Sequence, residues 1–356
     1  MSKYQKLDQI EHIHHRPDMY IGSLKPKKES NEWISTIKAT NIKQISSIKY
    51  SQGLVRIFIE AISNAIDNVW RSKDSNNPCK NIKIIINRDS GETSIWNDGL
   101  CIPIIKNSQT GLYNPNLIFG HLLTSSNYDD TEDRYTSGRN GLGIKLTNVF
   151  SKEFIIDVAD GEKRYKKRWY NNMRNNEDEK ITNFKKKGYT HITWIPDFEK
   201  FDCKEYSNNI IKIYNKIILD TAMITKVNIF LNGDKINIKS LLDYTKLYNP
   251  TSQSICFKSC DCEVVLTENT DNEEYEYIPF TNGVFNKDGG VHVDKWTEDI
   301  FRPIINKLNK PNKPQITMKD VKKFFRIFIN CTVKNPEFTS QSKTCLSHPE
   351  INTNVT

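Results

Sequence analysis

The stretch that most restricts how this chain can fold is Thr136–Leu146, which reads T-S-G-R-N-G-L-G-I-K-L. Gly138, Gly141 and Gly143 carry no side chain, so the backbone can adopt positive φ angles there and turn its N–H groups toward an anion. The apolar residues within 144–150 have helical spacing, which predicts that the loop runs into a helix. Such a loop is typical of a phosphate cradle, and an ordinary glycine-rich surface turn is the alternative for this stretch taken alone.

Two well-known phosphate-binding loops do not fit this spacing. A P-loop requires G-x-x-x-x-G-K-[ST], whereas Ile144 separates Gly143 from Lys145 and no Ser or Thr follows the lysine. A dinucleotide fingerprint requires G-x-G-x-x-G, and Leu146 occupies its last position. We therefore expect a phosphate cradle of another type, to which Lys145 adds a mobile positive charge.

The composition suits a globular protein. The chain has 356 residues, enough for two or three domains, and 37% of them are hydrophobic. No run approaches the roughly 18 apolar residues that a membrane span needs, and the first residues, Met1–Lys6, are polar. We expect no membrane association and no signal peptide, and a nuclear or cytoplasmic protein (in a viral factory, if the source is a virus) rather than a secreted one.

The positive charge is modest but clustered. The formal net charge is +8, from 51 basic and 43 acidic residues. Basic residues gather in Lys163–Arg168, Lys185–Lys187 and Lys307–Lys323. Clusters of this kind suit a nucleic-acid backbone, and a solvated protein surface is the alternative.

The eight cysteines form no C-x-x-C pair. Cys256, Cys260 and Cys262 lie close together, but no His stands beside them at the spacing of zinc ligands. A metal site is the less favoured alternative, and we expect reduced thiols, as in the cytosol or the nucleus.

The residues from Gly53 to Trp70 are predicted to form a helix, because apolar side chains recur along one face. Glu60, Asn64, Asp67 and Asn68 share a second stripe. Glu60 is placed to accept a proton from an attacking water, and Asn64, one turn later, offers a neutral oxygen to Mg²⁺ held by phosphates. A polar helix face without a chemical role is the alternative.

Further elements follow from local patterns. The predicted strands cover 83–87, 93–96, 154–158, 164–169, 191–194, 227–231, 255–257, 263–266 and 325–332, and the predicted helices cover 117–123, 208–221 and 296–308. The stretch 25–51 is interpreted as mixed and irregular, 124–134 as a long functional loop, and 232–240 as the domain boundary. Asp98 follows the strand at 93–96 and can accept a hydrogen bond from an adenine amino group, with an ordinary Asp-Gly turn as the alternative.

Occurring together and in this order, these elements resemble the N-terminal ATPase region of the type IIA DNA topoisomerases, in their eukaryotic and large-virus branch. That family shares a superfamily with gyrase, the mismatch-repair clamp ATPases, histidine kinases and the large heat-shock chaperones. The matching stretches are Y-Q-K-L-x-Q-I-E-H-I (Tyr4–Ile13), R-P-D-M-Y-I-G-S (Arg16–Ser23), E-A-I-S-N-A-I-D-N (Glu60–Asn68), L-I-F-G-H-L-L-T-S-S-N-Y-D-D (Leu117–Asp130), G-R-N-G-L-G-I-K (Gly138–Lys145) and Q-S-K (Gln341–Lys343).

The resemblance implies an α+β fold in two parts. The first is a Bergerat (GHKL-type) ATPase sandwich, a mixed sheet with helices on one side. The second is a partial transducer domain of the ribosomal-protein-S5-like fold. An N-terminal strap is expected at 1–24, the ATPase domain at 25–236 and the partial transducer at 237–356. No stretch resembles the DNA-cleavage machinery of these enzymes.

The resemblance also implies roles for single residues. Glu60 matches the general base, Asn64 the Mg²⁺ ligand, and Lys343 a catalytic cation that the transducer inserts toward the γ-phosphate. The nucleotide-binding residues implied by the match are Tyr4 (from the partner subunit's strap), Asn64, Asn68, Arg71, Asp98, Ser125, Ser126, Asn127, Gly138, Arg139, Asn140, Gly141, Leu142, Gly143, Ile144, Lys145, Gln341, Ser342 and Lys343.

The implied function is an ATPase that uses ATP and Mg²⁺ to close a homodimeric clamp on double-stranded DNA, and that drives duplex passage in the complete enzyme. Lys307 falls in a DNA-contacting segment of the family; Leu308 and Asn309 lack its charge, and Lys310 and Lys313 are expected to replace it. A mismatch-repair clamp is disfavoured by the T-S-S-N-Y-D-D and R-P-D-M-Y-I-G stretches. A non-hydrolysing DNA- or partner-binding remnant without cleavage activity is the alternative function.

Overall fold

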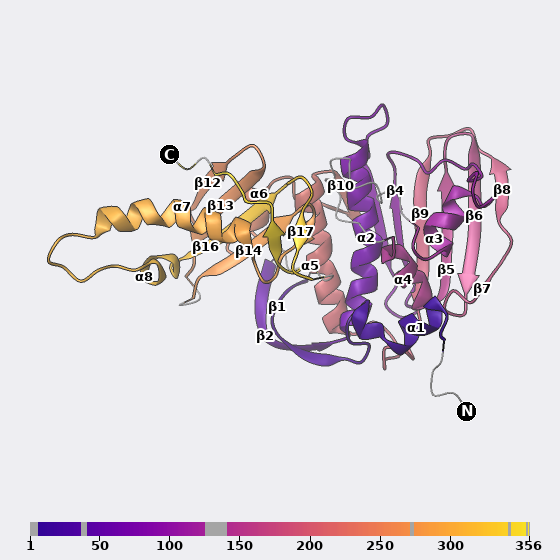
Figure 1. Cartoon of the computed structure of the whole chain (residues 1–356), viewed down its shortest axis with the longest axis horizontal. Helices are drawn as coiled ribbons and strands as arrows, with labels where there is room; N and C mark the ends of the chain where they lie inside the picture. The colour runs from indigo at the N-terminus through magenta and orange to yellow at the C-terminus, as the bar shows by residue number, and fades with distance from the viewer. Residues whose placement is uncertain are drawn as a thin grey trace. The chain divides into compact units, whose positions relative to one another are not determined.

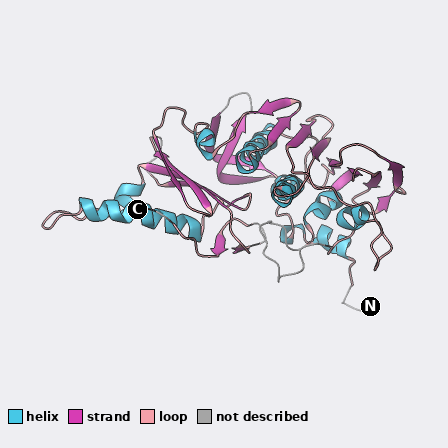
Figure 2. Cartoon of the chain, turned by 90° about the horizontal axis from the view of Figure 1, so that it is seen from above, coloured by secondary structure: helices cyan, strands magenta, loops and turns pink. Residues whose placement is uncertain are grey.

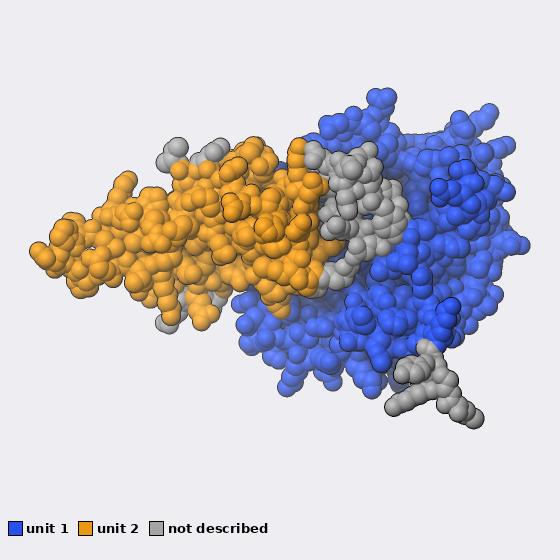
Figure 3. Space-filling model, in the orientation of Figure 1, with its two compact units in different colours: residues 1–130, 138–237 blue, residues 131–137, 238–356 orange. Residues whose placement is uncertain are grey.

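A computed structural model describes the chain at residues 6–36, 41–124, 141–270, 274–340, 343–353 and 355. The described residues divide into two compact units (Figures 1 and 3). Unit 1 lies within 1–130 and 138–237, and unit 2 continues from 238. Each unit has its own sheet and its own buried core, and each is described by itself.

Unit 1 is built on a nine-stranded mixed sheet in the order β11-β10-β3-β4-β9-β5-β6-β7, with β8 paired to β6. Strand β10 runs parallel to β3, and the other pairs are antiparallel. The described elements of unit 1 are α1 (Gln9–His15), the 3₁₀ helix η1 (Pro17–Met19), β1 (Lys27–Thr36), β2 (Asn41–Tyr50), α2 (Gln52–Ser72), β3 (Asn81–Ile86), β4 (Thr93–Asn97), α3 (Asn114–Gly120), α4 (Gly143–Val149), β5 (Ser151–Ala159), β6 (Lys163–Tyr170), β7 (Asn175–Asn176), β8 (Lys180–Asn183), β9 (Tyr189–Pro196), α5 (Asn208–Thr225), β10 (Asn228–Leu231) and β11 (Asp234–Ile236).

At strand β3, one face of this sheet is buried and the other faces solvent. In β3, Ile82, Ile84 and Ile86 are buried, while Lys83 and Ile85 are exposed. Helices α2, α4 and α5 contact strands of this sheet, and α2 also contacts the other two helices. An antiparallel or mixed sheet tolerates one solvated face, and its strands then alternate between apolar and polar side chains. The predicted α+β sandwich, a mixed sheet with helices on one side, is confirmed.

The interpretation of 25–51 as irregular was wrong. The segment forms the ten-residue strands β1 and β2, which pair antiparallel from Lys27 opposite Tyr50 to Thr36 opposite Asn41. Most side chains of β1 are exposed or half-buried, so the apolar alternation that marks a strand is absent from its sequence. The ribbon is held by its own hydrogen bonds and by α5, which contacts both strands.

Two predicted helices are displaced from their expected bounds. Helix α3 begins and ends three residues earlier than the stretch 117–123, with Pro115 in its first turn and Gly120 as its last residue. Helix α7 begins at Val291, directly after Gly290, rather than at Trp296.

Unit 2 has a five-stranded sheet in the order β12-β13-β16-β14-β15, in which β14 and β16 are parallel neighbours. Helix α7 follows β14 along the chain, precedes β16 and lies beside the sheet (Figure 2). Its Trp296 and Phe301 side chains are buried in the core of unit 2. Strands β14 and β16 and helix α7 thus form a βαβ unit, in which a helix connects two parallel strands. The described elements are α6 (Leu241–Thr245), β12 (Ser254–Lys258), β13 (Cys262–Glu268), β14 (Glu276–Thr281), β15 (Val284–Phe285), α7 (Val291–Leu308), α8 (Met318–Lys322), β16 (Phe325–Cys331), β17 (Glu337–Phe338) and β18 (Leu346–His348).

The expectation that all cysteines are reduced thiols was wrong for one pair. Strands β13 and β16 place Cys262 directly opposite Cys331, and the two form a disulfide in the buried core. The partners are 69 residues apart in sequence, so no local spacing pattern indicated the pair. The free cysteines are Cys79, Cys101, Cys203, Cys256, Cys260 and Cys345.

Among the described residues, no helix combines the length and the apolar composition that crossing a membrane requires.

Candidate functional site

The site is built along α2. Its apolar stripe, which includes Leu54, Phe58 and Ile62, is buried, and the hydroxyl of Ser51 accepts the N–H of Leu54 at 3.2 Å as the N-terminal cap. Because a helix has 3.6 residues per turn, the polar residues one turn apart on the neighbouring stripe face the same side. Helix α2 therefore carries Glu60 and Asn64 on its half-exposed side.

Glu60, the predicted general base, is held by an ion pair within its own helix. Arg56 Nη2 lies 2.5 Å from Glu60 Oε1, and both side chains are only 14% exposed. The spacing is i, i+4, at which oppositely charged side chains meet on a helix. The guanidinium thus fixes the orientation of the carboxylate, which a general base requires.

The end of the glycine-rich loop lies directly against this carboxylate. A Cβ atom added at Gly143, the first residue of α4, would overlap Glu60 Oε2 and approach Glu60 Cδ to 3.2 Å. The hydroxyl of Thr147, one turn further along α4, donates to the carbonyl oxygen of Ile57 on α2 at 2.9 Å. The two helices are therefore fixed together at the point where the loop meets Glu60.

The remaining predicted residues of α2 differ in exposure. Asn64 is exposed, and its Nδ2 donates to the Glu60 carbonyl at 3.0 Å, which leaves its Oδ1 as the atom suited to a cation. Asn68 is buried, and its Nδ2 donates to the Asp98 carbonyl at 3.1 Å. Arg71 is exposed in the last turn.

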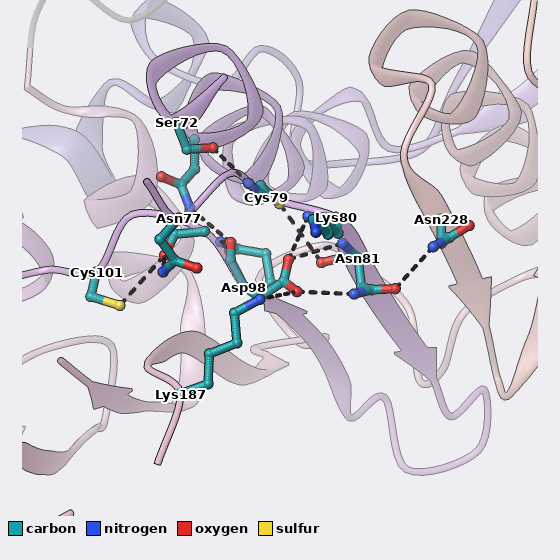
Figure 4. Close-up of polar contacts among 12 residues, drawn as sticks. Ser72, Asn77, Cys79, Lys80, Asn81, Asp98, Cys101, Lys187 and Asn228 are labelled. Atoms are coloured by element: carbon teal, nitrogen blue, oxygen red, sulfur yellow. Dashed lines mark hydrogen bonds and ion pairs between the residues drawn. The ribbon is translucent and has the colours of Figure 1, made fainter. Parts of the chain in front are cut away.

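Asp98 lies at the end of β4 at the centre of a hydrogen-bond cluster (Figure 4). Its Oδ1 accepts the backbone N–H groups of Lys80 and Asn81 at 2.7 and 2.9 Å, and its Oδ2 accepts Asn81 Nδ2 at 2.9 Å and Lys187 Nζ at 3.1 Å. Burial alone would raise the pKa of this carboxyl, but the donors from Asn81, Lys80 and Lys187 hold it below the usual value. Lys187, with a side chain 53% exposed, is the donor that an incoming group can most readily displace.

The turn after Asp98 requires glycine at position 99, because of its backbone conformation and its close neighbours. Its φ angle is +109°, and an added Cβ would lie 2.8 Å from Cys79 Cβ and 3.0 Å from Asn68 Nδ2. The carbonyl of Gly99 also accepts a hydrogen bond from Asn77 Nδ2 (Figure 4). Burial raises the pKa of the Cys79 thiol to about 12, so this sulfur is protonated at neutral pH.

The expectation that Lys145 carries a mobile charge was wrong for this structure. The residue is 3% exposed, and its ammonium donates to the carbonyl oxygens of Thr124 and Gly141 at 2.6 and 2.7 Å. These carbonyls flank the stretch 125–140. Burial lowers the pKa of Lys145 to about 8. Lys145 therefore joins Thr124 to Gly141 rather than projecting into solvent.

Within the predicted cradle, the structure describes only its last residues. Leu142 precedes α4, and Ile144 is buried in its first turn. The predicted site residues that lie outside the described residues are Tyr4, Ser125, Ser126, Asn127, Gly138, Arg139, Asn140, Gln341 and Ser342. Lys343, the predicted catalytic cation, belongs to unit 2, where it is half-buried and has a φ angle of +59°.

Most of the basic cluster Lys163–Arg168 is neutralised within unit 1. Arg164 pairs with Asp157, Lys167 with Glu179, and Arg168 with Glu153 and Glu177. Its suitability for a nucleic-acid backbone is correspondingly reduced. In unit 2, Lys307, Lys310 and Lys313 are exposed at the end of α7 and in the loop that follows.

Sequence reasoning missed three contributors to this site. Arg56 was detectable from its i, i+4 spacing to Glu60. Lys187 was visible only as part of a charge run, because it lies 89 residues from Asp98 in sequence. Asn81 gave no signal, because it reaches Asp98 through the pairing of β3 with β4. Among the described residues, no group of three or more His, Cys, Asp or Glu side chains is arranged to hold a metal ion.

Comparisons with known proteins agree with the resemblance noted in the sequence. A family described as DNA gyrase B matches residues 223–356. The DNA topoisomerase 2 of Invertebrate iridescent virus 6 is 40% identical over 368 residues, an alignment that covers 98% of this chain and 32% of that protein. The chain therefore spans about a third of the length of this relative.

Two solved structures share the whole fold. The ATPase region of Saccharomyces cerevisiae topoisomerase II is 36% identical with a TM-score of 0.89, covering 97% of this chain and 90% of that one. The ATPase and transducer domains of DNA topoisomerase II from Balamuthia mandrillaris are 30% identical with a TM-score of 0.89, covering 97% of this chain and 89% of that one. The predicted fold class, including the transducer fold of the second part, is confirmed.

Proposed function

Because this chain belongs to the type II DNA topoisomerase family, and matches its ATPase region, we propose that it binds ATP with Mg²⁺, hydrolyses it to ADP and phosphate, and closes as a homodimeric clamp on double-stranded DNA. As part of a longer enzyme, this cycle would drive the passage of one duplex through another. The proposed domains are the strap at 1–24, the ATPase domain at 25–236 and part of the transducer at 237–356.

The observation that carries the proposal is the approach of Gly143 to Glu60. A glycine-rich loop is suited to phosphate, and Glu60 is the carboxylate against which that loop ends. Arg56 holds the carboxylate in one orientation. A phosphate group bound by the loop would therefore lie beside a carboxylate held in a fixed orientation, which is the arrangement that activation of a water for hydrolysis needs.

The residues present fit ATP and Mg²⁺. No side chain at Gly143 separates the end of the loop from the Glu60 carboxylate, and Asn64 Oδ1 is a hard, neutral oxygen of the type that Mg²⁺ accepts. The protein offers the cation no cluster of carboxylates among its described residues, so the phosphates would supply most of the ligands. When bound, Mg²⁺ neutralises charge that develops on the transferred phosphoryl group.

In the proposed reaction, Glu60 accepts the proton of the attacking water while Arg56 keeps its carboxylate aligned. Lys145 keeps the residues on either side of 125–140 together through the carbonyl oxygens of Thr124 and Gly141. Lys343 supplies a positive charge toward the third phosphate. A contact of that kind exists only while the third phosphate is present, which gives hydrolysis a mechanical consequence.

Asp98 is proposed to accept a hydrogen bond from the amino group of adenine. Its carboxylate is occupied by four donors of this chain. An adenine amino group would have to replace Lys187 at Oδ2 or join it there. Asn68 and Arg71 are proposed to flank the nucleotide, Asn68 by fixing the Asp98 backbone.

DNA and dimer contacts belong to the same proposal. Lys307, Lys310 and Lys313 are exposed cations at one end of α7, where a phosphate backbone can reach them. Tyr4 in the strap is proposed to contact the nucleotide held by the partner subunit. The second candidate function, a non-hydrolysing DNA- or partner-binding remnant, would keep these contacts and lack turnover.

The test compares the parent chain with Glu60→Gln and, as a matched control, Glu32→Gln on the half-exposed face of β1. We expect Glu60→Gln to bind ATP nearly as well as the parent and to release phosphate at least about 10²-fold more slowly, because a general base is lost. Glu32→Gln should retain the parental rate. A parental rate in Glu60→Gln would rule out Glu60 as the base, and absence of Mg²⁺-dependent turnover in the parent would favour the remnant.

A further inference from the structure

The segment that carries Lys343 is tied to the turn that precedes α7. Asp288 N–H donates to the Thr344 carbonyl at 2.9 Å, and Leu346 N–H donates to the Gly289 carbonyl at 3.2 Å. A third bond comes from Asn286, whose Nδ2 donates to the carbonyl oxygen of Lys343 at 2.9 Å. Of these three bonds, only the last comes from a side chain, so a substitution can remove it alone.

Asn286 is itself held rigidly. It is 0% exposed, its backbone N–H donates to the Pro279 carbonyl at 2.9 Å, and its carbonyl accepts the N–H of Gly289 at 2.8 Å. Its Oδ1 is buried without a hydrogen-bond partner in the described structure. The side-chain amide is thus committed to Lys343 and to no other described group.

The backbone of Lys343 needs such support. Its φ angle of +59° lies in the left-handed region, which is unfavourable for a residue with a Cβ. Its N–H donates to the Ser340 carbonyl at 3.0 Å, and its carbonyl is the acceptor of Asn286. The two bonds hold the peptide groups on both sides of this strained residue.

The Lys343 segment also contacts Gly290, the residue that precedes α7. An added Cβ at this position would overlap the backbone of Leu346, coming within 2.6 Å of its nitrogen. The absence of a side chain therefore allows the Lys343 segment to lie directly on the residue that precedes α7. The position of Lys343 and the start of the main helix of unit 2 are fixed together.

We propose that Asn286 is a positioning residue for hydrolysis, because its amide fixes the main chain at Lys343 and so sets where the lysine ammonium is presented. The inference rests on the proposed role of Lys343 at the third phosphate. Asn286 does not touch the nucleotide. Substitution of Asn286 should therefore change the rate of ATP hydrolysis and the affinity for an ATP analogue, and it should leave the affinity for ADP unchanged.

The test uses Asn286→Asp, which keeps the size of the side chain and replaces the donating NH₂ by an oxygen. The matched control is Asn282→Asp. Asn282 is buried in the same hairpin, and its Nδ2 donates to the carbonyl of Val333 at 2.7 Å rather than to Lys343. Both variants lose one buried amide–carbonyl bond, whereas Asn282→Asp keeps the bond that Oδ1 accepts from the Val333 N–H at 2.8 Å. Thermal unfolding is therefore measured for both variants, and their kinetics are compared at a temperature at which both are folded.

The measured quantities are kcat for phosphate release and the ratio of the affinities for a non-hydrolysable ATP analogue and for ADP. Relative to Asn282→Asp, we expect Asn286→Asp to lower both about 3- to 10-fold, the range of one net hydrogen bond, with ADP affinity unchanged. Added to Lys343→Ala, Asn286→Asp should have no further effect on either quantity.

The outcomes separate this inference from the proposed function. If Lys343→Ala lowers kcat and the affinity ratio while Asn286→Asp matches Asn282→Asp, Asn286 is structural and the inference is overturned. If Lys343→Ala itself changes neither quantity, the proposed role of Lys343 is wrong and the inference falls with it.

Discussion

Replacing Gly143 by Ala tests the contact on which the proposed site depends. The added Cβ would overlap Glu60 Oε2 and lie 3.2 Å from Glu60 Cδ, closer than the roughly 3.5–4.0 Å at which carbon atoms pack without repulsion. The overlapping atom is the end of a flexible side chain, so the carboxylate can move aside. That movement takes Oε1 away from Arg56 and removes the base from its fixed orientation.

The substitution should leave the stability of the protein unchanged and lower the rate of hydrolysis. Gly143 begins α4 without a positive φ angle, so Ala can adopt its backbone conformation. The higher helix propensity of Ala offsets the loss of the Arg56–Glu60 ion pair, so the free energy of unfolding should change little. A displacement of the base by about 1 Å can cost on the order of 10²-fold in rate. We therefore expect kcat to fall about 10²-fold in a protein that is as stable as the parent.

The assay pairs steady-state phosphate release with urea unfolding, on Gly143→Ala, Glu60→Ala and the double variant. Removing the Glu60 side chain removes the overlap, so Gly143→Ala should have little further effect on turnover in the Glu60→Ala background. A Gly143→Ala variant with parental kcat would refute the argument, because the carboxylate could then move without loss. A large loss of stability would show that the contact is rigid packing rather than a ligand site.

Three further predictions concern other parts of the chain. Lys343→Ala should slow hydrolysis and reduce the preference for an ATP analogue over ADP, while ADP affinity changes little; equal losses for both nucleotides in binding assays would contradict it. Asp98→Ala should lower the free energy of unfolding by about 3 kcal/mol or more, because four donors lose their acceptor, and urea unfolding measures this. Burial lowers the pKa of His292 to about 3, so below about pH 6.5 the unfolded chain binds a proton that the folded chain does not. Stability should therefore decrease between pH 6.5 and 5 by up to about 1.4 kcal/mol per pH unit from this group, and His292→Phe should flatten the decrease in urea titrations at several pH values.

The sequence predicted those parts of the fold that have strong local patterns. Helix α2 was found from its apolar stripe, and its polar residues Glu60 and Asn64 stand where that periodicity placed them. Strands β1 and β2 were missed because their side chains are mostly polar and few of them are buried. A ribbon stabilised chiefly by its own pairing leaves little periodic signal in the sequence.

Contacts between distant segments were not predictable from local spacing. The approach of Gly143 to Glu60, the bond from Lys187 to Asp98 and the disulfide of Cys262 each join segments that are far apart in sequence and meet only in the folded chain. The prediction for Lys145 was wrong for a different reason. Its type and position suggested a mobile cation, but a buried ammonium needs acceptors, and nearby carbonyls provide them.

The coupling of ATP binding to dimerisation is the claim on which the clamp function depends, and sedimentation velocity tests it most directly. We predict that the chain is a monomer without nucleotide and with ADP, and a dimer with Mg²⁺ and a non-hydrolysable ATP analogue, because binding and association must strengthen each other by the same free energy. Deleting residues 1–7 should abolish the shift while retaining α1, whose Ile13 is buried in the core. A parent chain that remains monomeric at a saturating concentration of the analogue would contradict the clamp mechanism.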